Sequence, residues 1–348
     1  MSNKPYTLLP EWSAQDAVML TWPHTQSDWV DILDEVEAIY VALCHAITRF
    51  EKVLIVTQDA THQSHVSQVL NQANVAASKI IFTQAKSNDT WARDHGPLTV
   101  SDGETLRLLD FQFTGWGGKF AADYDNQINQ ALASQNCFTC DCETQDFILE
   151  GGGIETDGAG TLLTTSHCLL NPNRNSAYDR AQIETLLKTK LGMQQVIFLE
   201  HGYLAGDDTD SHIDTLARFV DKNTIVYQQC DDPNDEHFAE LNNMFEELRE
   251  LRNIHDKPYK LIALPWPAAK YDPDDAHRLP ATYANFLMIN QAVLLPVYQD
   301  NNDSRAIEIM QQACPDHEII AIDCSCIIRQ HGSLHCLTMQ LPNGVLQD

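Results

Sequence analysis

Hydrophobic residues recur every three to four positions in five stretches of this chain, which is the period of an amphipathic helix. These stretches cover residues 29–50, 62–72, 177–191, 237–251 and 304–314. Each one leads into a short apolar run that is typical of a buried strand, at 52–57, 79–84, 195–200, 260–265 and 318–323. The pattern therefore predicts an α/β fold in which helices and strands alternate.

Four further regions contain two apolar runs that are separated by a turn, which is the signature of a β-hairpin. The hairpins are expected at 97–111, 154–165, 216–228 and 286–297, with turns at 102–103, 157–158, 221–223 and 290–291. A fifth begins at 333–342, where the chain ends before a full return strand. The apolar run at 17–22 could supply that strand, and this pairing would join the end of the chain to its start.

The order helix, strand, loop and hairpin thus repeats along the chain. One residue marks each unit, at intervals of 56, 62, 73 and 51 residues: Asp94, Glu150, His212, Asn285 and Cys336. Regular spacing of this length indicates a repeat architecture. We therefore predict a single domain, residues 1–348, that forms a five-bladed β/α propeller. In such a ring every hairpin entrance faces one central channel, so the marker side chains should converge.

Three of these markers carry candidate chemistry on their own. Asp94 stands in SNDTWARDHGP, before a Gly-Pro turn. Glu150 precedes three glycines, where the backbone can approach a ligand closely. Cys336 follows His335 near the C-terminus, and its place in the repeat distinguishes it from the nine other cysteines.

The stretch DDTDSHID, residues 207–214, gathers the densest charge of the sequence. An extended backbone would place Asp210, His212 and Asp214 on one face, with Asp207 and Asp208 in the preceding loop. Three ionisable side chains on one strand face are costly to bury for structure alone. We therefore expect a functional role for this segment.

A thiol, an imidazole and several carboxylates suit attack on a planar cation. Two carboxylates, Asp94 and Asp214, could accept the N–H donors of a guanidinium and hold its carbon over the sulfur of Cys336. An ordinary thiol, with a pKa of ~8.5, is only a few per cent ionised at neutral pH. The bound cation or a nearby protonated histidine must therefore help to ionise it.

The chain is strongly acidic, with 22 Lys and Arg against 49 Asp and Glu and a net charge of −27. This balance argues against nucleic acid or an anionic membrane as partner and favours a small cationic molecule. No basic segment precedes an apolar run at the N-terminus, and no stretch approaches the ~20 apolar residues of a membrane helix, so we expect a cytoplasmic protein.

Ten cysteines in a cytoplasmic protein are expected to be reduced thiols rather than disulfides. Two groups invite a zinc site, Cys137/Cys140/Cys142 and Cys324/Cys326. A structural zinc site needs two C-x₂-C pairs, and neither group supplies two, so no metal is predicted there.

At these motifs the sequence resembles the agmatine deiminases, which are grouped with bacterial peptidylarginine deiminases in the guanidine-modifying (pentein) superfamily. The resemblance rests on NDTWARDHGP (88–97), EGGG (150–153), DDTDSHID (207–214) and GSLHC (332–336), and it runs over nearly the whole chain. It implies a five-bladed β/α propeller and hydrolysis of agmatine to N-carbamoylputrescine and ammonia, in putrescine and polyamine biosynthesis, without metal or organic cofactor.

The resemblance also implies roles for individual residues. Cys336 would be the nucleophile, His212 the general acid and base, and Asp94 and Asp214 the guanidinium clamps. Glu150 would be a partner of His212 and of the substrate. Three more residues are expected to contact substrate: the aromatic walls Trp91 and Trp116, and Asp208.

One departure from the agmatine-specific pattern is QHGSLHC (330–336), where more glycine is expected, as in GGGNIHC. It weakens the prediction of agmatine as substrate, and peptidyl-arginine or another guanidine is the alternative. A metal-dependent hydrolase with Asp207, Asp210, His212 and Asp214 as ligands is a second alternative. A non-catalytic propeller is a third. A homodimer is compatible with the sequence but is not predicted by any feature of it.

Overall fold

Five small sheets of this protein share one strand pattern. The structure is a computed structural model, which describes residues 4–347. In four of these sheets two consecutive antiparallel strands form a hairpin, and a third strand runs parallel to the second. In the fifth sheet the antiparallel pair comes from the two ends of the chain instead. In chain order the second to fourth sheets are β8 (Ile154–Thr156), β9 (Thr161–Thr165) and β10 (Gln195–Leu199); β11 (Ala217–Asp221), β12 (Thr224–Gln228) and β13 (Lys260–Leu264); β16 (Leu287–Ile289), β17 (Ala292–Val297) and β18 (Glu318–Asp323).

The other two sheets carry a fourth strand. In one, β5 (Leu98–Ser101), β6 (Leu106–Gln112) and β7 (Cys142–Ile148) are joined by β1 (Thr7–Leu8). In the other, β19 (Thr338–Pro342), β2 (Gln15–Thr21) and β3 (Lys52–Thr57) are joined by β4 (Ile80–Gln84). The last strand, β19, pairs antiparallel with β2, with Met339 opposite Met19. The predicted pairing of the chain end with its start is confirmed.

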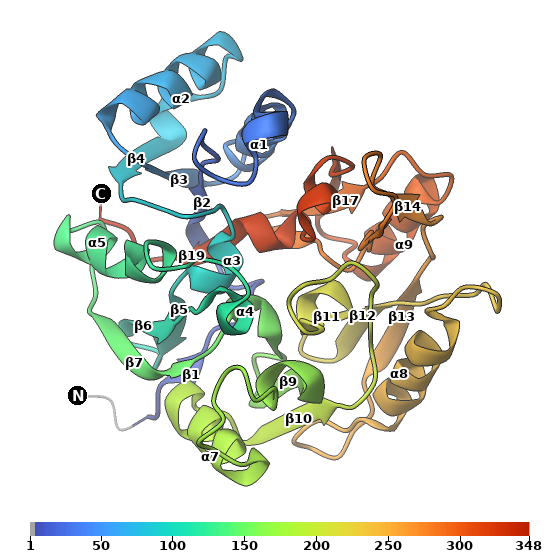
Figure 1. Ribbon diagram of the computed structural model, residues 1–348. Coiled ribbons are helices and arrows are strands. Elements are labelled where there is room, and N and C mark those ends of the chain that lie inside the picture. Colours follow the sequence, from blue (N-terminus) through green and yellow to red (C-terminus); the bar gives the residue numbers. More distant parts are fainter. Residues whose placement is uncertain (1–3, 348) are drawn as a thin grey trace.

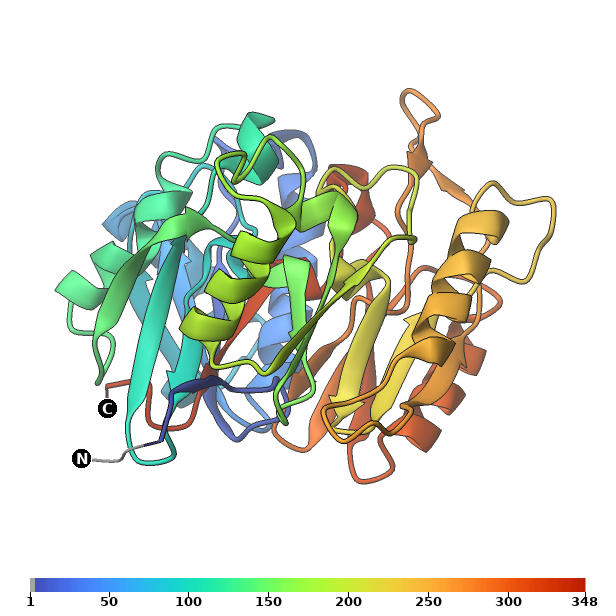
Figure 2. The ribbon, with the colours of Figure 1, turned by 90° about the horizontal axis from the view of Figure 1, so that it is seen from below.

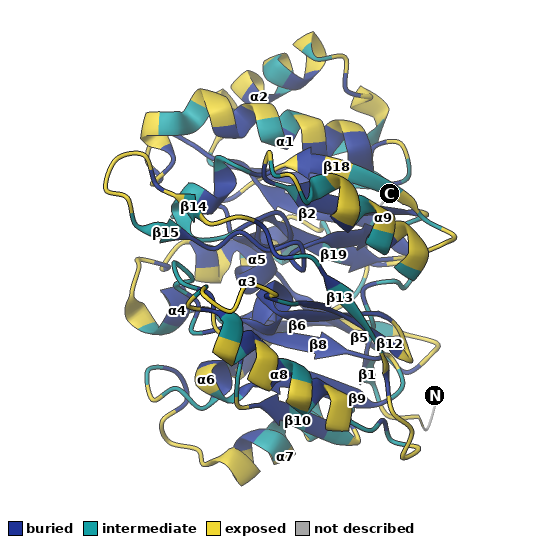
Figure 3. Cartoon of the chain, turned by 90° about the vertical axis from the view of Figure 1, so that its right-hand side faces the viewer, coloured by how far each residue is buried: buried dark blue, intermediate teal, exposed yellow. Residues whose placement is uncertain are grey.

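The longer helices lie outside these sheets (Figure 1). They are α1 (Leu33–Ile47), α2 (Ala60–Gln72), α7 (Arg180–Leu191), α8 (Phe238–Glu250) and α9 (Asp303–Ala313). Each turns an apolar face inward and an exposed face to solvent, as the yellow and blue surfaces of α8 show in Figure 3. In α8 the buried positions are Leu241, Met244 and Leu248, three and four residues apart, as the helical period requires. Four of these helices begin within three residues of the predicted start. The exception is α1, because a short 3₁₀ turn at Val30–Ile32 comes before it.

Several elements were not predicted from the sequence. Strand β7 completes the first sheet, and helix α5 (Ile128–Ser134) precedes it in the chain. A short hairpin, β14 (Lys270–Tyr271) and β15 (Arg278–Leu279), interrupts the fourth repeat. Figure 2 shows this hairpin, in orange, projecting from one side of the molecule. Strand β7 was missed because its sequence, CETQDFI, offers a single large apolar residue, Phe147, on its buried face.

Four short helical segments meet near the middle of the view in Figure 1, around the label α3. They are α3 (Ala92–His95), η4 (Gly151–Gly153), η5 (Ile213–Thr215) and η7 (His335–Leu337). Segment α3 contacts both η4 and η7, and η4 contacts η5. Residues from four different repeats are therefore brought together, as the marker spacing predicted. Among residues 4–347 no helix has the length and apolar character needed to span a membrane.

Candidate active site

The acidic segment 207–214 is not an extended strand, so the prediction that Asp210, His212 and Asp214 share one strand face is wrong. Asp210 and Ser211 adopt left-handed backbone angles, with φ of 67° and 66°. The Asp207 carboxylate stabilises this turn because it accepts hydrogen bonds from the Ser211 and Thr209 amides, at 2.8 and 3.1 Å. Local side-chain bonds of this kind compete with strand pairing.

The turn separates Asp210 from the two residues that follow it. Asp210 points toward Lys119 and Arg174 and forms ion pairs of 2.7 and 2.6 Å with them. His212 and Asp214 instead turn inward and have no exposed surface. Only these two of the three reach the interior of the site.

Asp94, His212 and Asp214 converge over Gly152. A Cβ atom added to Gly152 would lie 2.7 Å from His212 Nδ1, 2.8 Å from Asp94 Oδ1 and 3.1 Å from Asp214 Oδ2. The Gly152 amide also donates a hydrogen bond of 3.0 Å to Asp94 Oδ1. The sequence suggested that the glycines let the backbone approach a ligand. The structure shows that Gly152 makes room for these three side chains.

This crowding predicts the effect of Gly152→Ala. The added methyl group would push His212 and Asp94 apart, and we expect kcat/KM to fall about 100-fold, since displacements near 1 Å cost that much in an active site. Steady-state kinetics measures the change. Gly103→Ala serves as the control for a glycine substitution away from the site: nothing lies within 4 Å of its Cβ position, and its φ of 90° should cost stability without changing kcat/KM. A Gly152→Ala enzyme with normal kcat/KM would show that the three side chains do not need this arrangement.

Cys336 lies beside the same cluster, in η7, and is 3% exposed. Its sulfur is 3.9 Å from Asp214 Oδ2 and 3.5 Å from Asn285 Oδ1. The Asn285 oxygen also accepts the backbone N–H groups of His335 and Cys336, at 2.9 and 3.4 Å. Asn285, which the repeat spacing marked without assigning it a role, thus fixes the backbone that carries the thiol.

The two aspartates differ in charge state. Burial raises the pKa of Asp94 to about 6, although His212 opposes the increase. Burial would also raise the pKa of Asp214, but the hydrogen bond and charge of His335 outweigh it and lower that pKa below its usual value. Asp214 is therefore the more firmly ionised of the two.

The thiol and the imidazole respond oppositely to these surroundings. Burial raises the pKa of the Cys336 thiol well above its usual value, and the nearby carboxylates Asp214 and Asp94 add to the effect. Burial would lower the pKa of His212, but Asp94, Cys168 and Glu150 outweigh it and raise that pKa to about 10. Without a ligand the site therefore holds a neutral thiol and a protonated imidazole at neutral pH.

Three buried polar atoms of this cluster lack hydrogen-bond partners. Both ring nitrogens of His212 and the Oδ1 atom of Asp214 belong to this group. The contact between His212 Nδ1 and Asp94 Oδ1, at 3.5 Å, is an ion pair without hydrogen-bond geometry. Buried polar atoms are nearly always satisfied in native proteins, so unsatisfied atoms of a converging cluster point to a missing ligand.

Glu150 is completely buried and is held by an arginine that sequence reasoning did not find. Arg174 Nε lies 3.0 Å from both Glu150 oxygens. Glu150, Cys168 and His212 offer atoms that lie within 4.8 Å of one another, so Glu150 is near His212 as predicted. It is not among the residues that line the pocket described next. His212 and Asp214 do not line this pocket either, so the contact of Glu150 with substrate stays a prediction.

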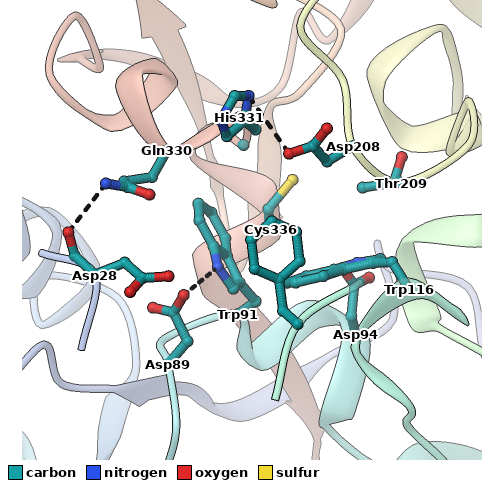
Figure 4. Close-up of a pocket in the computed structure, with 12 residues that line it drawn as sticks. Asp28, Asp89, Trp91, Asp94, Trp116, Asp208, Thr209, Gln330, His331 and Cys336 are labelled. Carbon is teal, nitrogen blue, oxygen red and sulfur yellow. Dashed lines mark hydrogen bonds and ion pairs between the residues drawn. The ribbon is translucent and has the colours of Figure 1, made fainter. Parts of the chain in front are cut away.

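A pocket at the surface is lined by Asp94 and Cys336 (Figure 4), and the empty space in it and in the solvent at its mouth amounts to about 410 Å³. Its walls are aromatic: Trp91, Trp116 and Phe120. Its other lining residues are mostly acidic or polar: Asp28, Asp89, Asp208, Thr209, Gln330, His331 and Gly332. The predicted substrate-contacting residues Trp91, Trp116 and Asp208 all lie on this surface.

The two tryptophans are fixed by the acids around them. Trp116 Nε1 donates a hydrogen bond of 2.9 Å to Asp94 Oδ2, and Trp91 Nε1 donates one of 3.0 Å to Asp89 Oδ2. Their rings stand edge to face, with centroids 6.3 Å apart. The two rings contact each other and together form one apolar wall of the pocket, against which an aliphatic chain could pack.

Comparison with known proteins places this geometry in a family. The family model described as Porphyromonas-type peptidyl-arginine deiminase matches residues 7–342. The chain belongs to this family. An agmatine deiminase of Stutzerimonas stutzeri is 30% identical to it, over 97% of this chain and 95% of its own length.

Solved structures of the deiminase family superpose over nearly all of the chain. A C. jejuni agmatine deiminase with a Cys-to-Ser substitution and bound substrate has a TM-score of 0.90 and 39% identity, covering 100% of this chain and 99% of its own. A Porphyromonas gingivalis structure, provisionally named an arginine deiminase, has a TM-score of 0.92 and 48% identity, with coverage of 98% and 100%. An amidinotransferase of Microseira wollei, at 12% identity and a TM-score of 0.53 over 99% of both chains, shares the fold alone.

The departure of this deiminase-family chain from the glycine-rich pattern falls on the pocket rim. His331 has a φ of 67°, a conformation that favours glycine. Its Nδ1 lies 2.9 Å from the Gly206 carbonyl and 3.6 Å from Asp208 Oδ2. Gln330 donates a hydrogen bond of 3.0 Å to the Asp28 carbonyl. These two side chains connect the loops on either side of the opening.

The alternative metal site predicted from the acidic segment is not assembled. Asp207 stabilises its own turn and Asp210 pairs with two cations, so of the three aspartates only Asp214 lies beside His212, and Asp214 already bonds to His335. Residues 4–347 contain two groups that could hold a metal ion by distance alone: Glu150, Cys168 and His212, and Asp272, Asp275 and His277. In the first, both Glu150 oxygens already face the Arg174 guanidinium. The cysteine groups 137/140/142 and 324/326 belong to neither, and all ten cysteines are free thiols.

Proposed function

We propose that this protein hydrolyses agmatine to N-carbamoylputrescine and ammonia through a covalent adduct on Cys336, as a step of putrescine and polyamine biosynthesis. The observation that carries the proposal is the set of unpartnered atoms, Asp214 Oδ1 and the His212 nitrogens, beside the Cys336 thiol. A guanidinium supplies the N–H donors that the carboxylate lacks. The agmatine deiminases among the relatives support the same substrate.

The pocket distinguishes agmatine from a peptide-linked arginine by charge. With the guanidinium between Asp94 and Asp214, the aliphatic chain would pass Trp91 and Trp116 toward the more exposed acids of the rim. Asp28, Asp89 and Asp208 line that outer part, and a free ammonium group at the end of agmatine would offset their charge. A peptide backbone carries no such cation.

Binding of the cation would prepare both reacting groups. The guanidinium neutralises Asp94 and Asp214, whose charges oppose ionisation of Cys336. The thiol would then lose its proton to solvent, since His212 already carries one, and the thiolate would attack the guanidinium carbon. The resulting tetrahedral adduct would expel ammonia. His212, protonated in the free enzyme, would donate the proton to the leaving nitrogen.

Hydrolysis of the adduct would complete the cycle. After donating its proton, neutral His212 can accept one from a water molecule that attacks the thiouronium carbon. The second tetrahedral adduct would release the ureido product and regenerate the thiolate, so water supplies the oxygen of N-carbamoylputrescine. Neither step needs a metal ion, which agrees with the absence of a predicted metal requirement in the sequence.

The pKa of Asp94 predicts the acidic side of the pH profile. A clamp must be ionised to bind a cation, and Asp94 gains a proton as the pH falls through about 6. Because kcat/KM reports ionisations of the free enzyme, we expect the plot of log kcat/KM for agmatine against pH to become less steep by one unit of slope at about pH 6. A continued rise above pH 6 belongs to the Cys336 thiol, whose pKa burial raises. Initial rates at low agmatine concentration across pH 4.5–9 measure this limb. A limb centred near 4 would assign it to an ordinary carboxylate instead.

Assays with matched guanidines test the substrate. We expect ammonia and a ureido product from agmatine, and at least about 100-fold lower kcat/KM for free arginine and for an arginine within a short peptide. Faster turnover of the peptide would replace agmatine with peptidyl-arginine, the activity after which the matched family model is named. Absence of turnover with all three would refute the proposal of a guanidine hydrolase.

The remaining features of the overall architecture are also proposals. Five sheets with one strand pattern, and the pairing of β19 with β2, support a five-bladed propeller that forms a single catalytic domain. The cytoplasmic location and the homodimer stay untested, and size-exclusion chromatography with light scattering would measure the oligomeric state.

A further inference from the structure

A second histidine, next to the thiol, lies between two buried carboxylates. His335 directly precedes Cys336 and is 1% exposed. Its Nδ1 is 2.7 Å from Asp214 Oδ2, and its Nε2 is 2.6 Å from Glu11 Oε2. A carboxylate can only accept hydrogen bonds, so both ring nitrogens can donate only when both carry hydrogen. The ring thus connects the guanidinium clamp Asp214 to a residue near the start of the chain.

Glu11 is placed to balance positive charge from several repeats. It lies in the segment between β1 and β2 and is 8% exposed. Its Oε2 atom is 2.9 Å from Arg218 Nη2 and 3.4 Å from Arg93 Nη2. Its Oε1 atom accepts the Met288 amide at 2.7 Å. These contacts with Arg218, Arg93 and Met288 fix the position of the Glu11 carboxylate, and so they fix where the His335 ring can bind to Glu11.

The contact with His335 leaves Asp214 half occupied. Asp214 Oδ2 accepts from His335, whereas Asp214 Oδ1 is buried without a partner. One oxygen is therefore fixed by the protein and the other is available to a ligand. Asp94, in contrast, has both oxygens in contact with the protein, through Gly152 and Trp116.

We propose that Glu11 and His335 are positioning residues that aim Asp214 at the guanidinium and keep it an anion. The N-terminal segment then takes part in substrate recognition without touching the substrate. The proposal rests on the proposed function, because it needs Asp214 to act as a clamp.

Glu11→Gln tests the proposal with little change of shape. Loss of the Glu11 charge removes the second carboxylate partner of His335, so the His335 ring supports the charge of Asp214 less well. We expect kcat/KM for agmatine to fall about 10- to 100-fold, the range typical of residues that orient an active-site group. We also expect KM to rise and a lower acid limb, which reports Asp214 and lies below the Asp94 limb near pH 6, to move up in pH.

Glu155→Gln is the matched control. Glu155 is also 8% exposed and is hydrogen-bonded to the Nε atom of Arg218, the same arginine that pairs with Glu11. It makes no hydrogen bond to His335 among those found in residues 4–347. The Glu155 charge also acts on His335 without a hydrogen bond, so its substitution should cost stability in a thermal melt and move the acid limb less than Glu11→Gln does. Equal shifts in both variants would reduce Glu11 to a structural ion-pair partner of Arg218 and overturn the proposal.

His335→Asn answers the same question from the other partner, and it decides the matter if Glu11→Gln does not fold. An amide at this position can still donate one hydrogen bond toward Asp214 but does not carry charge. We expect it to shift the acid limb as Glu11→Gln does. In the double variant the two shifts should not add, because Glu11 acts on Asp214 only through His335.

The possible results separate this inference from the proposed function. If the unaltered enzyme hydrolyses agmatine, while Glu11→Gln or His335→Asn keeps its KM and acid limb, only the positioning role is wrong. Additive shifts in the double variant would also refute it. If the unaltered enzyme hydrolyses no guanidine, the proposed function itself fails, whatever the variants do.

Discussion

Cys336→Ser is expected to fold and to bind agmatine, and to lose turnover by a factor on the order of 10⁵, the scale of losing a catalytic nucleophile. A serine hydroxyl keeps the size of the thiol but is a far weaker nucleophile at neutral pH. The clamps Asp94 and Asp214 do not depend on the sulfur for their own positions, because Trp116, Gly152 and His335 hold them. Binding and chemistry should therefore separate in this variant.

Two measurements check this separation. Isothermal titration should give an agmatine affinity for Cys336→Ser within about tenfold of the KM of the unaltered enzyme, and ammonia release should fall to background. Cys324→Ser is the control, since Cys324 is also buried but does not line the pocket. It should retain most of its activity. Ammonia release by Cys336→Ser at more than about 1% of the normal rate would remove Cys336 from its role.

Those parts of the fold that depend on local pattern could be predicted from the sequence. Strands β3 and β18 were predicted at their observed bounds, because each is a short apolar run that follows an amphipathic helix. The pairing of β19 with β2 followed from counting hairpins, since one repeat lacked its return strand. The markers Asp94, Glu150, His212, Asn285 and Cys336 were found in the same way, and the structure brings them from five repeats into one region.

Contacts between distant segments could not be predicted in this way. Glu11 and His335 are 324 residues apart in sequence, and no periodic signal connects them. Arg174 follows a turn after β9 and resembles a surface arginine until the fold buries it against Glu150. The error in segment 207–214 has a local cause, because the bonds of Asp207 to its own turn override the strand that alternation suggested.

The acids that contribute to the net charge of −27 differ in whether a cationic side chain lies beside them. The buried acids of the site are mostly compensated: Glu11 by Arg93 and Arg218, and Glu150 by Arg174. The rim acids Asp28 and Asp208 have no arginine or lysine partner among the ion pairs found in residues 4–347. A cation that enters the pocket therefore meets acidic side chains first at the rim and then at Asp94, whose charge is opposed by His212.

Asp94→Asn should reduce kcat/KM for agmatine about 1,000-fold, through both a higher KM and a lower kcat. The amide has nearly the shape of the carboxylate but cannot accept the charged fork of a guanidinium as an anion does. It also removes the charge that lies 3.5 Å from His212 Nδ1 and that raises the pKa of that imidazole. His212 would then be less fully protonated when the leaving nitrogen needs a proton.

The pH profile distinguishes this role from a general loss of structure. If Asp94 is the group that titrates near pH 6, its replacement should abolish the acid limb at that position as well as lower the rate. Asp110→Asn is the matched control: Asp110 is 4% exposed and accepts hydrogen bonds of 2.8 and 2.7 Å from Asn129 and Gln130, away from the pocket. This control should keep the limb near 6 even if it melts at a lower temperature. An Asp94→Asn enzyme with an unchanged limb and an unchanged KM would show that another carboxylate holds the cation, and Asp214 alone would then have to account for recognition.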